Sequence, residues 1–527
     1  MQTVQSPATS GLRLSPLAAC LGAVLALGAV VPSASAGSAQ PTTAAWPFQH
    51  HVSNGGPVPE GLRRRAAASK ALRHDSPAPH GGLLLPVTSC ADDGGSGTLR
   101  HVALTASSGD TIDLSGLTCS TITLESGAIN IDVEDLTVMG PGAGALAIDG
   151  NGTDRVFHHG GTGTLQLSYL TVTNGNYTVV TGLGYGGGCV YSKGSISLAE
   201  AVVSSCTATG DTEAVGGGML ARDGIVMFGS TIKDSKAIAL TGTSGLAVAA
   251  GGAFAVYSFT LENSTISGNS VTTPLGKAYA GGMFGSSGVS AKYSTVTGNS
   301  ATTGNASGSG YYAIGGGLVA KDPIIQNCTI DNNSADAAAG VYLLSSDAGS
   351  SALITNTTIS GNRAALAGGG LFTEGDLRLR NSTIAFNVGG SGGAGGLIVG
   401  GTTSDLESNI IADNSPSGPS GAADFDGGST VTGANNLIKI AGATITVPPD
   451  TITQDPQLGP LAANGGETRT HAISATSPAF DAGNNSAGLL YDQRGPGFAR
   501  EVGASADIGA YELDPDIIFV DGFDVGG

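Results

Sequence analysis

Acidic and basic side chains come together at one short stretch of the chain, TEGDLRLR at 373–380. In an extended strand alternate side chains share a face, so Asp376, Arg378 and Arg380 point the same way and the leucines between them point inward. Glu374 lies just upstream. This set could serve a polysaccharide lyase, in which an arginine removes a proton beside a sugar carboxylate that the two acids hold through Ca²⁺. The alternative is a solvated outer face of paired charges.

A second group of oxygen ligands occurs in DGNGTD at 149–154, where Asp149, Asn151 and Asp154 could bind Ca²⁺. The same residue types favour an ordinary turn, which is the simpler interpretation. We expect no cofactor, and Ca²⁺ is the one alternative that the sequence leaves open. All eight histidines lie outside 160–420, so neither a Ser-His-Asp triad nor a histidine metal site is expected there.

The elements that must position these residues are repeats. A pair of adjacent residues, the second of them valine or isoleucine, recurs at steps of 25 to 34 residues. We call that valine or isoleucine the anchor of its repeat. A drifting period near thirty is typical of a solenoid whose strands keep their length while its turns absorb insertions. The ten anchors are Val138, Val172, Val203, Ile232, Ile266, Val296, Ile330, Ile359, Ile384 and Ile411.

Glycine-rich phrases such as GGGML at 216–220 and GGGLF at 368–372 precede the anchors and lead into short apolar strands. Glycine lets neighbouring turns stack closely, and the apolar side chains can fill a shared interior. With 86 glycines, 12% charged residues and no helical periodicity, the chain predicts an all-β fold. We expect a right-handed single-stranded parallel β-helix, a pectate-lyase-like solenoid of about ten or more coils.

An asparagine stands three residues after the anchor in six consecutive repeats. A primary amide both donates and accepts, so equivalent amides about 4.8 Å apart can hydrogen-bond along a column. We expect a buried structural ladder rather than a row of ligand-binding amides, because buried polar groups need partners. The members of this asparagine ladder are Asn269, Asn299, Asn333, Asn362, Asn387 and Asn414.

The open strand edges at the two ends of such a shaft need covers. At the N-terminal end Leu99, Val102, Ala103 and Ala106 share one helical face, which predicts a short helix over the first coil. At the other end residues 434–513 are expected to form the C-terminal cap.

The N-terminus has the layout of a secretory signal, with Arg13, an apolar run, and Ala34-Ser35-Ala36 at its end. The apolar run is shorter than the ~18–20 residues that a membrane-spanning helix needs, so no transmembrane segment is expected in the mature chain. The expected organisation is a signal peptide at 1–36, a linker or propeptide at 37–85, the β-helix with its N-terminal cap at 86–433, the C-terminal cap at 434–513 and a tail at 514–527.

The chain has six cysteines, and removal of the signal peptide with Cys20 leaves five. At least one thiol therefore stays free or pairs between chains. Cys90 and Cys119 flank one segment and are the best candidates for a disulfide in an oxidising compartment. The 22 basic and 41 acidic residues give a net charge of −19, which would repel nucleic acid and make polyanion binding depend on a bridging cation. We expect a monomer.

The alternation of glycine phrases with T-I-x-x-N over roughly 165–415 resembles the repeats of polymorphic outer membrane proteins. DPQLGPLAANGGETRTHAISATSPAFDAG at 455–483, YDQRG at 491–495 and DIGAYE at 507–512 resemble the choice-of-anchor Q segment of secreted bacterial β-helix proteins. The resemblance implies an exported bacterial surface protein. A sorting anchor normally follows this segment, and we recognise no such signature after it.

Carbohydrate binding would be helped by aromatic platforms, yet the one tryptophan, Trp46, falls in the expected linker and the tyrosines are scattered. This pattern favours a secreted or cell-surface protein with an adhesive or recognition role. Its partners would be surface glycans or host or cell-surface proteins. The alternative function is a carbohydrate-active enzyme, either a polysaccharide lyase or a glycoside hydrolase, on the same fold.

Overall fold

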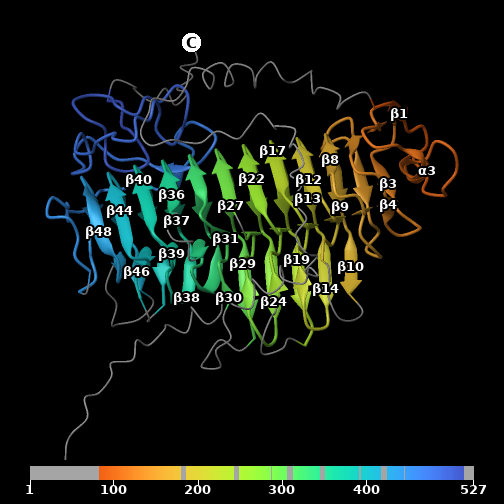
Figure 1. The fold of residues 1–527 in the computed structure, drawn as a ribbon. Coiled ribbons are helices and arrows are strands. Elements are labelled where there is room, and N and C mark those ends of the chain that lie inside the picture. The colour runs from red at the N-terminus through yellow and green to blue at the C-terminus, as the bar shows by residue number, and fades with distance from the viewer. Residues whose placement is uncertain are drawn as a thin grey trace, which may run out of the picture.

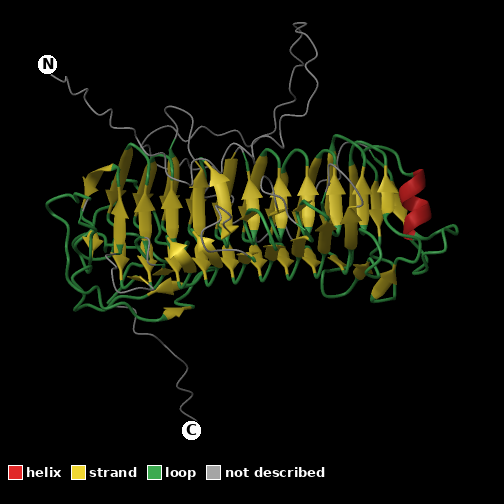
Figure 2. Cartoon of the chain, turned by 90° about the horizontal axis from the view of Figure 1, so that it is seen from below, coloured by secondary structure: helices red, strands yellow, loops and turns green. Residues whose placement is uncertain are grey.

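The computed structural model describes residues 82–515, except for 180–185, 242–247, 287, 305–312, 345–350, 391–392, 417–423 and 444. The expected signal peptide, the expected linker up to residue 81 and the tail from residue 516 lie outside these residues. Within them the chain is an elongated stack of coils built from short parallel strands, with one short helix at the N-terminal end (Figures 1 and 2). Four long sheets of 11 to 13 strands confirm the predicted parallel β-helix of ten or more coils.

From β7 (Phe157–His159) to β46 (Ser415–Pro416) each coil visits the four long sheets in turn, and we number the sheets 1 to 4 in that order. Sheet 1 contains β4 (Ile129–Ile131), β7 (Phe157–His159), β11 (Val190–Ser192), β16 (Met219–Ala221), β21 (Ala253–Ala255), β26 (Met283–Gly285), β31 (Leu318–Lys321), β35 (Val341–Leu344), β39 (Leu371–Thr373), β43 (Leu397–Val399) and β47 (Phe425–Gly427). Sheet 2 contains β1 (Leu84–Pro86), β2 (Thr111–Asp113), β5 (Leu136–Met139), β8 (Thr164–Ser168), β12 (Ser195–Ala199), β17 (Ile225–Phe228), β22 (Ser258–Glu262), β27 (Gly288–Lys292), β32 (Ile324–Gln326), β36 (Ala352–Thr355), β40 (Leu377–Arg380), β44 (Thr403–Glu407) and β48 (Thr430–Ala434).

The other two long sheets complete each coil. Sheet 3 contains β3 (Thr121–Thr123), β6 (Ala147–Asp149), β9 (Thr171–Thr173), β13 (Val202–Ser204), β18 (Thr231–Lys233), β23 (Thr265–Ser267), β28 (Thr295–Thr297), β33 (Thr329–Asp331), β37 (Thr358–Ser360), β41 (Thr383–Ala385), β45 (Ile410–Ala412) and β49 (Leu437–Ile438). Sheet 4 contains β10 (Asn176–Val179), β14 (Thr207–Gly210), β19 (Lys236–Ala239), β24 (Ser270–Thr273), β29 (Ser300–Thr303), β34 (Ser334–Ala337), β38 (Arg363–Ala367), β42 (Val388–Gly389) and β46 (Ser415–Pro416), with short returning strands β15 (Ala214–Val215), β20 (Val248–Ala249), β25 (Ala278–Tyr279) and β30 (Ala313–Ile314).

Nine of the ten predicted anchors lie in successive strands of sheet 3, from Val172 in β9 to Ile411 in β45. The first anchor is wrong. Val138 belongs to β5 of sheet 2, and Ile148 of β6 is the residue in register with Val172. Both strands carry buried β-branched residues, so the apolar pattern alone could not tell the two sheets apart.

The inward side chains of the four sheets form one continuous apolar core that runs the length of the shaft. At the N-terminal end helix α3 (Leu99–Thr105) covers the first coil through Leu99, Val102 and Ala103, as predicted. A disulfide joins Cys90 to Cys119 beside this helix, which confirms the predicted pairing. Strand β1 begins at Leu84, two residues before the expected start of the shaft.

The C-terminal cap has two parts. Residues after β49 cover the last coil. Ala441 forms a β-bridge to Phe425, and Ile452 forms one to Leu437. The side chain of Ile445 enters the core. The remaining C-terminal segment, which we define as 455–513, instead turns back along the side of the shaft (blue in Figure 1). It includes the antiparallel strands β50 (Leu461–Ala462) and β51 (Thr470–His471).

A column of outer asparagines holds the C-terminal segment against the shaft. Asn327, Asn356, Asn381 and Asn435 occupy equivalent turns between sheets 2 and 3, each with a positive φ that asparagine tolerates. Their side-chain amides donate to carbonyl oxygens of residues 492, 491, 484 and 482 at 2.8 to 3.2 Å. These four asparagines therefore bind a segment that is distant in sequence.

The asparagine ladder is continuous. Each Nδ2 donates to Oδ1 of the next member at 2.9 to 3.0 Å, and the backbone amide of each member donates to the same oxygen. The column ends on Asp424, whose Oδ1 accepts from Asn414 and whose Oδ2 accepts from the amide of Ile440. The pKa of Asp424 rises to about 6 because the carboxyl is buried. A carboxylate suits this end position because it can accept from both sides.

The glycine phrases and the asparagine ladder meet inside the turns. A Cβ on Gly252, Gly282 or Gly317 would lie about 3 Å from the amide of the facing asparagine. Real Cβ atoms rarely come so close, so only glycine leaves room for the ladder. The two repeated phrases of the sequence are thus the two sides of one contact.

The remaining free thiol among the described residues, Cys328, fills a place in a column of hydroxyl groups. Elsewhere in that column a serine or threonine oxygen accepts a hydrogen bond from a backbone amide of the preceding coil. Ser264 accepts from the amide of Ser230, and Thr357 accepts from the amide of Cys328 itself. Cys328 accepts from the amide of Ser294 in the same way, and its Sγ donates to the carbonyl of Gln326. Burial raises the pKa of Cys328 to about 12, so the group is an unreactive thiol.

We expect Asn333→Asp to destabilise the protein. The change removes the Nδ2 donor to the carbonyl of Val296 and to Oδ1 of Asn362, and it places a carboxylate against both oxygens. Each buried group that loses its partner costs about 1–3 kcal/mol, so the urea midpoint should fall clearly. Asn151→Asp, at an exposed turn, is the matched control and should unfold like the parent. Equal midpoints for the two variants would contradict the structural role of the ladder.

Cys328→Ser should leave the free energy of unfolding in urea within about 1 kcal/mol of the parent, because a serine oxygen can make both hydrogen bonds of the thiol. Cys328→Val has no acceptor, so the buried amide of Ser294 would lose its partner and the protein should lose about 1–3 kcal/mol. In the native parent the thiol should not react with a thiol reagent until the protein unfolds. A stable valine variant would refute this account of the column.

Candidate functional site

The 374–380 cluster lies at and after the turn into β40, on sheet 2. Leu377 and Leu379 are buried, Arg378 is exposed, and Arg380 is half-buried. The Arg380 guanidinium pairs with the carboxylate of Asp405 in the next coil, donates to the Asp405 carbonyl at 2.8 Å and lies 3.3 Å from a carboxylate oxygen of Glu407. Arg380 is therefore held as a link between coils, whereas Arg378 faces solvent.

The two acids of the cluster point to different partners. Asp376 accepts three hydrogen bonds of 2.8 to 2.9 Å from Thr402 and Thr403, and the backbone donor of Thr403 is the main cause that lowers the pKa of Asp376. Glu374 accepts from the hydroxyl of Tyr342 on sheet 1 at 2.5 Å. The four residues therefore lie near one another in sequence without forming one open site.

The Ca²⁺ candidates also have protein partners. One oxygen of Asp149 accepts from the amide of Asn151 at 2.7 Å and from Nδ2 of Asn174 at 2.8 Å. Asp154 accepts from the amides of Arg155 and Ala128. In the part of the chain that the structure describes, no three His, Cys, Asp or Glu side chains are grouped so that they could hold a metal ion. The geometry at 149–154 is that of a closed turn.

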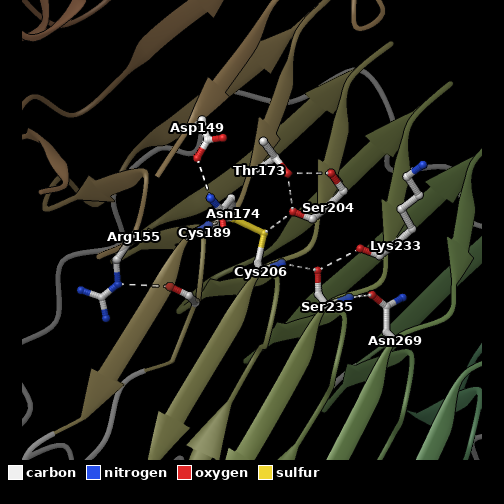
Figure 3. The surroundings of a disulfide bond; sticks show 12 residues. Asp149, Arg155, Thr173, Asn174, Cys189, Ser204, Cys206, Lys233, Ser235 and Asn269 are labelled. Carbon is white, nitrogen blue, oxygen red and sulfur yellow. Dashed lines mark hydrogen bonds between the residues drawn. A yellow bond between two sulfur atoms is a disulfide. The ribbon is translucent and has the colours of Figure 1, made fainter. Parts of the chain in front are cut away.

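A second disulfide, Cys189–Cys206, was not expected from the sequence (Figure 3). Its sequence separation of 17 is the spacing between a phrase glycine and its ladder asparagine, as for Gly252 and Asn269. Cys206 precedes Ser235 and Asn269 in the same column. The disulfide thus takes the place of a glycine–asparagine contact in an early coil, and a cysteine in both phrases is the signal that could have revealed it.

Sheet 3 has one outer face with two different environments. In the later coils the C-terminal segment covers this face, so Thr329 and Thr358 are fully buried. The Thr329 hydroxyl donates to the carbonyl of Arg469, and the Thr358 hydroxyl donates to Oε1 of Gln493. In the earlier coils the equivalent Thr231 and Thr265 are partly exposed. The hydroxyl surface that binds the C-terminal segment therefore continues, uncovered, along the N-terminal half of the shaft.

An open groove lies at the edge of this uncovered half, at the corner between sheets 3 and 4. It has a volume of about 390 Å³ and offers two hydroxyl groups, one carboxylate and one ammonium group. Gly268 forms part of its floor with a φ of +64°, and a Cβ there would lie 2.6 Å from Oδ1 of Asp234. The lining residues are Ser205, Thr207, Asp234, Lys236 and Gly268.

Comparison with known proteins agrees with this architecture. A protein-family model described as a right-handed β-helix region matches residues 282–447. The crystal structure of pectate lyase Pel9A is 13% identical, with a TM-score of 0.37 over 83% of this chain and 98% of that chain. A likeness of this size does not define a function. No curated protein matches the chain.

The topology and the family match define the fold as a right-handed parallel β-helix. A membrane span would need a long apolar helix, and among residues 82–515, gaps excepted, none has the length and hydropathy for it.

The two arginines of β40 should differ in their effect on stability. Arg380→Ala removes charged hydrogen bonds to the next coil and should cost about 1–3 kcal/mol in urea unfolding. Arg378→Ala removes an exposed side chain on the same strand and should stay within about 0.5 kcal/mol of the parent. If both variants unfold like the parent, Arg380 is not a link between coils.

Proposed function

We propose that the protein is exported and acts outside the cell or at its surface as a recognition protein that binds glycan chains along the open half of its shaft. Two disulfides support an oxidising location, because such bonds persist mainly outside the cytosol. The regular coils supply a rigid, elongated surface for a linear ligand (Figure 2).

The groove at the corner of sheets 3 and 4 is the observation that carries this proposal. Ser205 and Thr207 offer hydroxyl groups that both donate and accept, and Asp234 and Lys236 add one acceptor and one donor. Sugar hydroxyls need partners of both kinds. The partly exposed hydroxyl groups of Thr231 and Thr265 on sheet 3 extend the same chemistry along the axis. The groove is open at the surface, which suits a polymer rather than an enclosed small molecule.

The alternative function, a polysaccharide lyase or glycoside hydrolase, has less support from the geometry. A lyase needs a base beside acids that can hold a cation against the sugar. Here Arg380, Asp376 and Glu374 already make bonds within the shaft. Arg378 is exposed, and its neighbour in the next coil, Asp405, already pairs with Arg380. We therefore favour recognition over catalysis.

A panel of immobilised linear polysaccharides, neutral and acidic, would test the proposal by surface binding of the purified protein. We expect the parent to bind at least one polymer. Thr207→Tyr should weaken that binding at least tenfold, because the ring fills the groove while tyrosine remains favourable in a strand. Such a loss corresponds to about 1.4 kcal/mol of binding free energy.

Thr432→Tyr is the control, since Thr432 is an exposed threonine in β48 of sheet 2, far from the groove. It should bind and unfold like the parent. No binding to any polymer of the panel, or equal binding by the groove variant and the parent, would overturn the proposed function.

A further inference from the structure

The outer face of sheet 4 carries one straight column of polar side chains along the shaft. Neighbouring strands β14, β19, β24, β29, β34 and β38 pair in parallel and align one residue of each in register (Figure 1). The first of these residues, Thr207, lies in the groove. The column consists of Thr207, Lys236, Ser270, Ser300, Ser334 and Arg363.

The two cations of this sheet 4 column are available to a ligand. Lys236 and Arg363 are exposed, and within the described ranges neither takes part in an ion pair. Other cations of the shaft, such as Arg380 and Lys439, form ion pairs with carboxylates. Two unpaired cations in one line are notable in a chain with a net charge of −19.

Asp234 and Asp336 lie near these cations and form no ion pair with them. Asp234 borders the groove, but its Oδ1 lies over Gly268 of the next coil. Asp336 on β34 is buried and accepts from the amide of Ala313 at 2.8 Å. Burial is the main cause that raises the pKa of Asp336.

We propose that the sheet 4 column binds a linear anionic glycan, one that carries carboxylate or sulfate groups, along the axis of the shaft. Lys236 and Arg363 each contact an acidic group, and the three serines between them bond to sugar hydroxyls. Four coil steps of about 4.8 Å separate the two cations by roughly 19 Å, which requires an extended polymer. This inference rests on the proposed function and adds the charge and orientation of the ligand.

Alginate, a linear polyuronate, and its carboxyl-reduced neutral form are suitable probes. We expect the parent to bind alginate more tightly than the neutral form, and added salt to weaken only the alginate complex. Lys236→Gln and Arg363→Gln should each weaken alginate binding about fivefold, the upper range for exposed ion pairs. The neutral polymer should bind these variants and the parent equally.

Lys193→Gln and Arg378→Gln are the matched controls, because they remove one exposed cation each from other faces of the shaft. They should leave alginate binding unchanged. A disaccharide from alginate is too short to reach both cations, so it should bind the parent and the Arg363 variant equally.

Several results would overturn the inference. These are equal binding of alginate and its neutral form by the parent, equal losses in the column variants and the controls, or preference for a single-stranded polynucleotide over alginate. The first of these would leave glycan recognition itself standing. Failure of the parent to bind either alginate polymer and every polysaccharide of the panel would refute the proposed function together with this inference.

Discussion

The stacking distance between coils is the constraint on which the rest of this structure depends. Parallel strands repeat about every 4.8 Å, so a buried polar group at a turn must find its partner in the coil directly beside it. Asparagine meets this requirement in both directions. Asn299 accepts from Asn269 through Oδ1 and donates through Nδ2 to Asn333 and to the carbonyl of Ile266. One side chain therefore satisfies groups in two neighbouring coils.

The same constraint explains why different chemistry can fill one position of the coil. Opposite each ladder asparagine stands a glycine, since a larger residue would collide with the amide. Toward the N-terminal end the pair becomes Gly218 and Ser235, and then the disulfide Cys189–Cys206. Each pair joins the same two turns of its coil. The shaft thus moves from a covalent link between these turns to a close van der Waals contact without a change in its path.

Much of this architecture could be predicted from the sequence because it repeats. Nine of the ten anchors, the ladder, the helical cap and the Cys90–Cys119 disulfide all follow from local patterns. The sideways path of the C-terminal segment could not, because it depends on contacts such as that of Asn356 with the carbonyl of residue 491, 135 positions away. Likewise Arg380 shares the strand pattern of Arg378, and only the acids of the next coil distinguish them.

Net charge likewise says nothing about how the charges are arranged in space. A total of −19 predicts that a polyanion needs a bridging cation, yet a sum over the chain cannot show that two unpaired cations share one line on sheet 4. Which side chains align is decided by the coil lengths between them. Those lengths vary in the turns, so the alignment became visible only in the folded shaft.

The lateral C-terminal segment also changes how the shaft should come apart. A simple solenoid couples only adjacent repeats, so it can open one coil at a time from either end. Here one segment bonds to several coils between Asn327 and Asn435, and these coils cannot separate singly while it stays in place. The C-terminal half should therefore open as one cooperative unit, and the earlier coils should exchange their amide hydrogens more independently.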